Sequence, residues 1–285
     1  MPELPEVETI RLGLQAKILN KKIVDLKVSK DKLIKNNTKS FIEKLVGNKF
    51  LDIDRVGKLL IFVLPEEKYL LIHLKMTGQL IYSKEDDLVA GGHNWPKVDD
   101  LPNKYSHIIF TFDDNSKLFF NDLRQFGYLK LVNKADKQKA VDRHGLQPTD
   151  KEFTLKNFKA LVKGRRAVLK AFLLNQQIIS GIGNIYADEI CFRAKVMPSR
   201  HLDTLSQDEI RRLWQASKYI IKKAIDKKGT TFSDYRNADG GRGGFADFLK
   251  VYGRQDKKCL NCKKSNIKKI KLAGRGTHFC PSCQK

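Results

Sequence analysis

The sequence lacks any apolar run near the ~20 residues that a helix needs to cross a bilayer, so it is not expected to be a membrane protein. Its first eight residues, Met-Pro-Glu-Leu-Pro-Glu-Val-Glu, contain no apolar segment of the secretory type, which favours a cytoplasmic protein. Acidic residues are in deficit, with 32 Asp and Glu against 55 Lys and Arg and a formal net charge of +23. This charge favours a polyanionic partner, with nucleic acid first and an anionic membrane surface second. A generally lysine-rich proteome would give the same charge.

The composition of the 285 residues is 41 % apolar, which is enough for a core and argues against wholesale disorder. The length suggests two domains with room for a small appendage. Ile10, Leu14 and Ile18 recur at helical spacing and predict a helix over residues 2–19. From 23 to 132 short apolar segments alternate with polar turns, which favours an antiparallel sandwich or barrel. The expected strands lie at 23–28, 50–53, 59–64, 69–74, 79–82, 107–112, 117–121 and 127–132, and the polar segment 84–104 is expected to be a surface loop.

The second half of the chain has a helical pattern, and the polar stretch 133–150 is the expected boundary. Helices are predicted at 155–162, 168–174, 184–192 and 206–225. Ser206 and Glu209 have the spacing of a capping box at the start of the last of these helices. Residues 229–245 are rich in glycine and are expected to form a flexible loop.

Four of the five cysteines form the pattern Cys259-x2-Cys262-x17-Cys280-x2-Cys283, the spacing of a four-thiolate zinc site. The alternative is a pair of disulfides, which the odd cysteine count and the missing signal peptide disfavour. The surrounding ~30 residues hold little apolar mass, so one structural zinc ion is expected to supply most of their folding energy. Cys191 stands apart in an apolar helical stretch and is expected to be a core residue.

The N-terminus offers a nucleophile if the initiator methionine is removed, because Pro2 then carries a secondary amine. An α-amino group titrates near neutrality, and its attack on a sugar C1′ would give a cationic iminium that favours later eliminations. Glu3 would lie beside it as a general acid or base. The alternative is a structural one, since proline and glutamate also suit the first turn of a helix.

Several motifs follow one another along the chain: 1–9 (MPELPEVET), 57–58 (GK), 73–78 (HLKMTG), 122–127 (DLRQFG), 181–189 (GIGNIYADE), 251–254 (VYGR) and the cysteine pairs. In this order they resemble bacterial formamidopyrimidine-DNA glycosylases, the bifunctional enzymes that remove oxidised purines from DNA. The resemblance covers essentially the whole chain.

The resemblance implies an α+β multi-domain fold. An N-terminal helix and an antiparallel β-sandwich would occupy 1–134, and a helix-two-turn-helix domain would occupy 150–228. A base-capping loop at 229–250 and a four-cysteine zinc finger at 251–285 would follow. The implied partner is damaged double-stranded DNA, bound by a monomer with no membrane association. The implied location is the cytoplasm of a bacterium, at the nucleoid.

The resemblance also implies catalytic roles. Pro2 would be the nucleophile, Glu3 would assist sugar-ring opening, and Lys58 would hold the phosphate beside the lesion and help β-elimination. Arg275 would contact the same phosphate region and help δ-elimination. The alternatives are a solvated strand-end lysine for Lys58 and one more surface cation for Arg275.

Other matching positions imply DNA contacts. Met76, Arg124 and Phe126 would fill the gap left by an extruded nucleotide, although Met76 and Phe126 could instead be core residues at strand ends. Asn184 would bind phosphate at a helix start or act as that helix's N-cap. Further expected contacts, the last two on a basic helix before Asn184, are His73, Tyr105, Arg166 and Lys170.

The sequence departs from the family pattern at Tyr105, where a histidine is common, and at Leu123 and Gln125, where proline and arginine are common. The segment 84–104 is also longer than usual. Two rival hypotheses remain open. One is the sister family for oxidised pyrimidines, endonuclease VIII, and the other is a non-catalytic zinc protein that binds nucleic acid.

Overall fold

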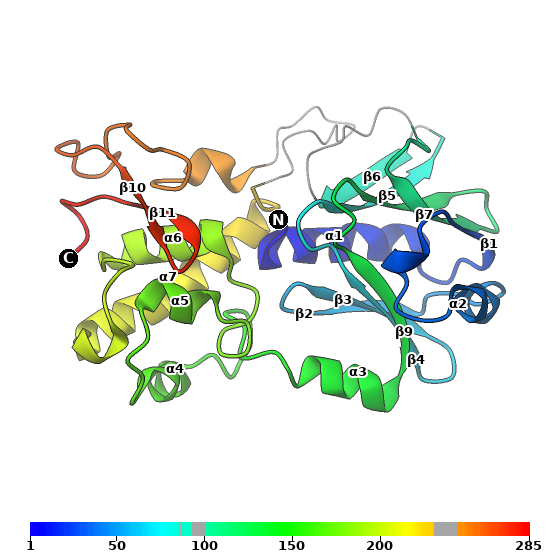
Figure 1. Ribbon diagram of the computed structural model, residues 1–285, viewed down its shortest axis with the longest axis horizontal. Coiled ribbons are helices and arrows are strands. Elements are labelled where there is room, and N and C mark those ends of the chain that lie inside the picture. The colour runs from blue at the N-terminus through cyan, green and yellow to red at the C-terminus, as the bar shows by residue number, and fades with distance from the viewer. Residues whose placement is uncertain (86, 93–100, 231–243) are drawn as a thin grey trace. The chain divides into compact units, whose positions relative to one another are not determined.

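The computed structural model describes residues 1–85, 87–92, 101–230 and 244–285 (Figure 1). The chain divides into two compact units. The first contains the described residues of Met1–Asp142 and Lys228–Gly244, and the second contains Arg143–Lys227 and Phe245–Lys285. The chain therefore leaves the first unit, builds most of the second, and returns briefly to the first before ending in the second.

Two antiparallel sheets build the first unit. The five-stranded sheet has the order β1 (Ile23–Val28), β7 (Ser106–Phe112), β8 (Lys117–Asp122), β5 (Gly78–Lys84) and β6 (Asp87–Gly92). The four-stranded sheet has the order β2 (Asp52–Val56), β3 (Leu59–Leu64), β4 (Lys68–His73) and β9 (Tyr128–Asn133). The helices of this unit are α1 (Leu4–Ile18), η1 (Asp31–Leu33), α2 (Thr38–Leu45) and α3 (Lys134–Val141).

The core of the first unit contains inward-facing residues of both sheets, as the alternation of side chains along strands requires. The Phe50 ring lies 5.0 Å from that of Phe62 and 6.0 Å from that of Phe110, both in edge-to-face geometry. Helix α1 packs against the edge strands β2 and β6, one from each sheet. Its buried residues Ile10, Leu14 and Ile18 are those whose spacing predicted the helix.

Helices build most of the second unit: α4 (Leu155–Val162), α5 (Leu169–Leu174), α6 (Asn184–Ala194), η2 (Leu202–Thr204) and α7 (Gln207–Asp226). The predicted capping box of α7 is confirmed, because the Ser206 hydroxyl accepts the Glu209 backbone N–H at 3.2 Å and Glu209 Oε2 accepts the Ser206 backbone N–H at 2.8 Å. After η3 (Phe245–Phe248), the finger contains the hairpin β10 (Lys268–Leu272) and β11 (Arg275–Phe279). Phe192 of α6 packs with Val251, Ile267 and the finger cysteines.

The prediction of a surface loop over 84–104 is wrong in part. Strand β5 continues to Lys84, and β6 pairs with it as an antiparallel hairpin. Strand β6 was not predicted because acidic residues surround its short apolar segment. Its packing against β5 and α1 stabilises it. Residues 93–100 of the same segment lie outside the described residues. Helices α2 and α3 were also not anticipated.

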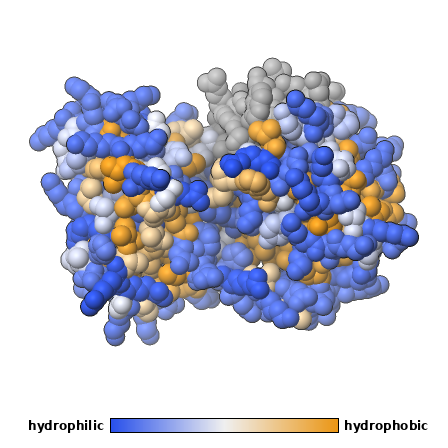
Figure 2. All heavy atoms as spheres, in the orientation of Figure 1, coloured by the Kyte–Doolittle hydropathy of each residue, from blue (hydrophilic) through white to orange (hydrophobic). Residues whose placement is uncertain are grey.

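The visible face of both units is mostly hydrophilic, with small hydrophobic areas between the polar side chains (Figure 2). None of the helices in the described ranges combines the length and the hydropathy that crossing a bilayer requires. In the described residues, the antiparallel sheets and the helical second half agree with the expected fold class.

Candidate active site and nucleic-acid interface

Pro2 and Glu3 lie buried at the start of α1. Glu3 is the N-cap residue, and its backbone N–H donates to Glu6 Oε2 at 2.9 Å. The proline of the first helical turn is therefore Pro5, and Pro2 precedes the helix. Burial lowers the pKa of the Met1 α-amino group below its ordinary value of 8.0, and the Glu3 and Glu6 carboxylates oppose that shift without cancelling it. A larger fraction of this amine is neutral at pH 7 than in a free peptide.

Lys58 belongs to the same site. It follows Gly57, whose φ of 56° forms the turn between β2 and β3. Lys58 is only 6 % exposed, so the alternative of a solvated strand-end lysine is wrong. Its positive charge is close enough to contribute to the lowered pKa of the chain-terminal amine. Pro2, Glu3 and Lys58, three of the four predicted catalytic residues, therefore gather in the first unit.

Glu6 connects this site to the start of the glycine-rich segment. Its Oε1 accepts the Thr230 backbone N–H at 2.7 Å and the Thr230 hydroxyl at 3.0 Å. Gly229 has a φ of 78°, and a Cβ at this position would meet Glu6 Oε1 at 2.7 Å. Sequence reasoning did not single out Glu6, because its partner is 224 residues away. Thr231 and Tyr235, further polar residues of the glycine-rich segment, lie outside the described residues.

Met76, Arg124 and Phe126, the residues predicted to fill the gap left by an extruded nucleotide and called the wedge below, lie on two loops. One carboxylate forms hydrogen bonds to both loops. Met76 is in the β4–β5 connection, and Arg124 and Phe126 are in the β8–β9 connection. The buried Asp122 accepts the Thr77 hydroxyl, the Arg124 backbone N–H at 3.2 Å and the Gly127 backbone N–H at 2.7 Å. The Thr77 hydroxyl also accepts the Arg124 backbone N–H at 2.9 Å. These bonds fix both loops relative to the five-stranded sheet.

Phe126 is 53 % exposed, so the alternative that it is a core residue is wrong. The Arg124 guanidinium lies 4.6 Å from the Phe126 ring centroid, an arrangement that presents a cation and an aromatic ring together. Met76 is half-buried. The next residue after Phe126 must be small, because a Cβ on Gly127 would approach Phe120 Cζ to 2.7 Å. An exposed aromatic ring on an ordered loop is suited to insertion between bases.

Two further predicted DNA contacts lie at or beside the ends of strands. His73 ends β4, and its Nδ1 accepts the Lys75 backbone N–H at 3.0 Å. Tyr105 directly precedes β7, and its carbonyl accepts the Asp122 backbone N–H at 3.1 Å. His107, which sequence reasoning did not include, lies buried with Nε2 at 3.0 Å from the Asp122 carbonyl. Burial lowers the pKa of His107, so this ring favours the neutral form.

In the second unit, three expectations change. Asn184 is the first residue of α6 and Gly183 is the N-cap, so the N-cap alternative for Asn184 is wrong. Arg166 precedes α5, and its side chain is 90 % exposed, so it is not on a helix. Lys170 is on α5 but fully buried, with its ammonium paired with Asp188. That burial argues against the expected direct contact between Lys170 and DNA.

Arg275 begins β11 and is exposed. The turn before it needs left-handed backbone at two positions, with φ values of 49° at Ala273 and 70° at Gly274. Asn184 Nδ2 donates to the Gly276 carbonyl at 3.0 Å, which places the start of α6 beside the residue that follows Arg275. Asn184 and Arg275, predicted from separate motifs, are therefore neighbours in the second unit.

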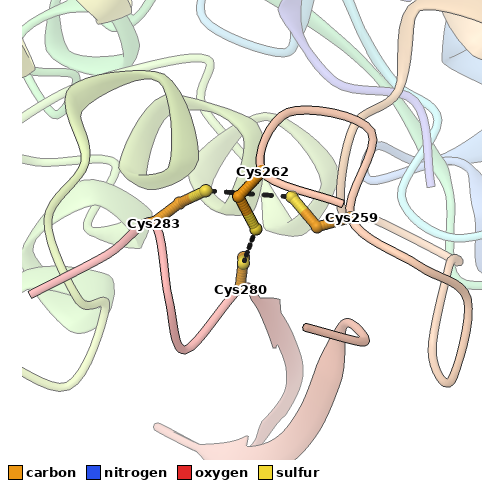
Figure 3. Close-up of side chains that lie close together, drawn as sticks. All are labelled: Cys259, Cys262, Cys280 and Cys283. Carbon is orange, nitrogen blue, oxygen red and sulfur yellow. Dashed lines mark hydrogen bonds between the residues drawn. The ribbon is translucent and has the colours of Figure 1, made fainter. Parts of the chain in front are cut away.

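The four paired cysteines converge on one point (Figure 3). Cys259 Sγ lies 3.8 Å from Cys283 Sγ, and Cys262 Sγ lies 3.7 Å from Cys280 Sγ. Four thiolates at ~2.3 Å from a tetrahedral zinc ion would be about 3.8 Å apart, so the donor set fits this metal. Hydrogen bonds from the Ser265 and Lys264 backbone lower the pKa of Cys262 to about 6, which favours the thiolate that binds metal. Cys191 is buried in the core as expected.

Comparison with known proteins agrees with this geometry. Three family models match: the formamidopyrimidine-DNA glycosylase N-terminal domain at 1–129, the H2TH domain of the same enzymes at 144–236, and the zinc finger found in FPG and IleRS at 256–285. The chain belongs to the formamidopyrimidine-DNA glycosylase family. The fold class and the four-cysteine zinc finger expected from the resemblance are confirmed.

Relatives in this family match over their whole length. The chain is 40 % identical to the formamidopyrimidine-DNA glycosylase of Listeria monocytogenes and 38 % identical to that of Streptococcus mutans, with both chains fully covered. Among solved structures, Lactococcus lactis Fpg in complex with DNA containing an abasic site is similar, with a TM-score of 0.87, 31 % identity and 99 % coverage of both chains. The complex of Lactococcus lactis Fpg with DNA containing FAPY-dG has the same TM-score and identity, and covers 99 % of this chain and 100 % of that one.

Proposed function

We propose that this glycosylase removes oxidised purines, such as 8-oxoguanine and formamidopyrimidines, from duplex DNA and then cleaves the strand as an AP lyase. The observation that carries the proposal is the buried start of the chain, where burial lowers the pKa of the Met1 α-amino group and where Pro2, Glu3 and Lys58 are buried together. An unprotonated amine next to a carboxylate and a lysine has the parts that covalent catalysis at a sugar carbon requires. The solved complexes of relatives with abasic and FAPY-dG DNA support the same substrate class.

Pro2 acts as the nucleophile after removal of Met1. Its nitrogen bonds to C1′ as the bond between C1′ and the damaged base breaks, and the base leaves with a proton. Protonation of the ring oxygen O4′ by Glu3 then opens the sugar and leaves a C1′ iminium on Pro2. The buried position of Glu3, 2 % exposed, suits a group that exchanges protons with substrate rather than with bulk water.

Two eliminations follow from the iminium, which accepts electrons from the adjacent carbon. Loss of a proton from C2′ and cleavage of the C3′–O3′ bond complete β-elimination, with Lys58 holding the departing phosphate. Loss of the C4′ proton and cleavage of the C5′–O5′ bond complete δ-elimination, with Arg275 at that phosphate. Water releases the sugar fragment from Pro2, and a one-nucleotide gap remains.

Met76, Arg124 and Phe126 replace the extruded nucleotide in the duplex. Flipping a base costs a few kcal/mol of stacking and pairing, and an aromatic or apolar side chain recovers part of that cost. Exposed Phe126, with Arg124 beside its ring, is suited to this role, and the Arg124 guanidinium can also donate to the orphaned base.

The remaining predicted residues bind the backbone of the DNA. His73, Tyr105, Arg166 and Asn184 contact phosphates, whereas buried Lys170 acts through its neighbours.

One zinc ion is structural, because four thiolates close the tetrahedron and leave no position for substrate. The enzyme works as a monomer in the bacterial cytoplasm, at the nucleoid, with the catalytic domain at 1–134, the DNA-binding helices at 150–228, the capping loop at 229–250 and the finger at 251–285.

Excision from two matched duplexes tests the substrate class. We expect faster release of 8-oxoguanine opposite cytosine than of thymine glycol in the same sequence, measured under single-turnover conditions. Faster release of thymine glycol would contradict the proposed purine specificity and identify the sister activity on oxidised pyrimidines.

A further inference from the structure

Three buried side chains of the second unit form a charged network that the proposed chemistry does not use directly. Lys170 of α5 donates to Asp188 Oδ1 of α6. Asp188 Oδ2 accepts the backbone N–H of His278 in β11 at 2.8 Å and lies 3.1 Å from His278 Nδ1. Lys170 and Asp188 are fully buried. Burying an ion pair costs desolvation energy and seldom adds net stability. We therefore look for a role of this pair in positioning the segments that it joins.

Two contacts attach β11 to one face of α6, one from Asn184 and one from Asp188 of the network. Asn184 Nδ2 donates to the Gly276 carbonyl at 3.0 Å, and Asp188 binds His278. Asn184 and Asp188 are one helical turn apart, about 6 Å along the helix axis. The Gly276 carbonyl and the His278 N–H flank Thr277 in the chain, so two side chains one helical turn apart hold two backbone groups of one short stretch of β11. Together the two contacts fix the position of the strand along the helix as well as its distance from it.

Lys170 joins both contacts. Besides Asp188, its Nζ donates to the Asn184 carbonyl at 3.3 Å. Strand β11 is also the strand through which the hairpin packs, because Thr277–Phe279 are buried whereas β10 is exposed over most of its length. Gly276 contacts α6 through its backbone carbonyl and His278 through its backbone N–H and its ring, whereas the side chain of Arg275 is exposed.

We infer that Lys170, Asp188 and His278 are positioning residues for Arg275, and that they set the rate of the second elimination. This inference rests on the proposed role of Arg275 in δ-elimination. Asp188 fixes the strand three residues beyond Arg275, and Asn184 fixes it one residue beyond. Without the Asp188 contact the arginine remains present but its guanidinium is no longer held at one place. Base release, assigned to residues of the first unit, does not depend on this hairpin.

The test separates the steps on one substrate. A duplex with 8-oxoguanine opposite cytosine, labelled at both ends, reports base release, the β-elimination product and the β,δ-elimination product in a single turnover. For zinc-loaded Asp188→Asn we expect δ-elimination to slow about tenfold or more relative to base release, because small displacements of a catalytic group carry large costs in rate. The β-elimination product should therefore accumulate.

Two further variants give the comparison its meaning. Arg275→Ala should accumulate the same product, and the double variant Asp188→Asn/Arg275→Ala should add nothing to the effect of Arg275→Ala. Ile190→Ala is the matched control, since Ile190 is also fully buried on α6 and belongs to no part of the network. We expect it to lower thermal stability without changing the ratio of the two products.

The outcomes are distinguishable. If Arg275→Ala leaves the product ratio unchanged, the proposed role of Arg275 is wrong, and the inference falls with it. If Arg275→Ala shifts the ratio but folded, zinc-loaded Asp188→Asn does not, the positioning inference alone is overturned. If Asp188→Asn does not fold, His278→Ala decides, because it keeps the Lys170–Asp188 pair and removes the Nδ1 contact. A shifted ratio for His278→Ala supports the inference, and an unchanged ratio overturns the role assigned to the His278 ring, because the backbone N–H of residue 278 still donates to Asp188 in this variant.

Discussion

At the scale of single residues, buried carboxylates position the chemistry by accepting backbone N–H groups from distant segments. Asp122 holds two loops, Glu6 holds residues 3 and 230, and Glu189 accepts the backbone N–H groups of residues 250 to 252 at 2.9–3.0 Å. Each carboxylate replaces water with fixed backbone donors, which orders the donor segment. At Glu189 the three backbone hydrogen bonds lower the pKa, but burial raises it by more.

Asp122→Asn tests whether one carboxylate orders the predicted wedge. The amide would present a donor toward groups that already donate, so we expect a loss of about 1–3 kcal/mol in the free energy of unfolding. Excision of 8-oxoguanine from a duplex should fall as well. Urea unfolding and single-turnover excision measure the two effects. Asp113→Asn is the control, because Asp113 is exposed in the neighbouring β7–β8 turn. Equal stability and excision for both variants would contradict this role.

The amine at the chain end predicts the pH dependence of base release. The nucleophilic form of the Pro2 amine is neutral. Burial lowers the pKa of the Met1 α-amino group, one residue earlier, below 8.0, and we expect the Pro2 amine to have a similarly lowered pKa once Met1 is removed. The rate should therefore stay constant from high pH down to that lowered pKa and fall below it, as protonation removes the nucleophile. Single-turnover excision across the range, with circular dichroism to show that the protein stays folded, measures the profile. A rate that rises as the pH falls from 8 to 5 would contradict an amine nucleophile.

At the scale of elements, local pattern predicted most of the fold. The predicted strands at 23–28 and 59–64 and the helix at 155–162 match β1, β3 and α4 at both ends. Apolar periodicity and turn residues determine these elements locally. The strand predicted at 50–53 is displaced, because β2 starts at Asp52. The surface loop predicted at 84–104 contains β6. Both strands lie at sheet edges and depend on packing with α1, which no local window contains.

Removal of zinc tests the finger as an element. Phe192, Val251 and Ile267 are its main apolar contacts, too few to hold the hairpin without metal. We expect Cys262→Ser to lose zinc, protection of β10 and β11 from hydrogen exchange, and strand cleavage. Helices α4 to α7 should keep their protection. Cys191→Ala, at the buried cysteine outside the cluster, should retain zinc. Full protection of the hairpin in metal-free Cys262→Ser would show that zinc is not structural.

At the scale of the whole molecule, the predicted site residues lie in motifs far apart in the sequence, some in the first unit and some in the second. The resemblance assigned Pro2, Glu3 and Lys58 to one site, because Pro2 and Glu3 lie in the motif at 1–9 and Lys58 lies in the motif at 57–58. It could not reveal that Lys170 is buried, because the sequence does not distinguish a lysine paired with Asp188 from one that contacts DNA. The net charge of +23 agrees with a nucleic-acid partner but identifies no residue of the site.

The most direct test of the central claim is covalent trapping. The protein, with Met1 removed, is incubated with an 8-oxoguanine·cytosine duplex in the presence of borohydride, and the adduct is mapped by peptide mass spectrometry. The proposed mechanism predicts one adduct, a reduced sugar bonded to the Pro2 nitrogen, because borohydride reduces the iminium that attack by this amine forms. Absence of an adduct on 8-oxoguanine and on an abasic site, or an adduct on a lysine with Pro2 unmodified, would contradict it.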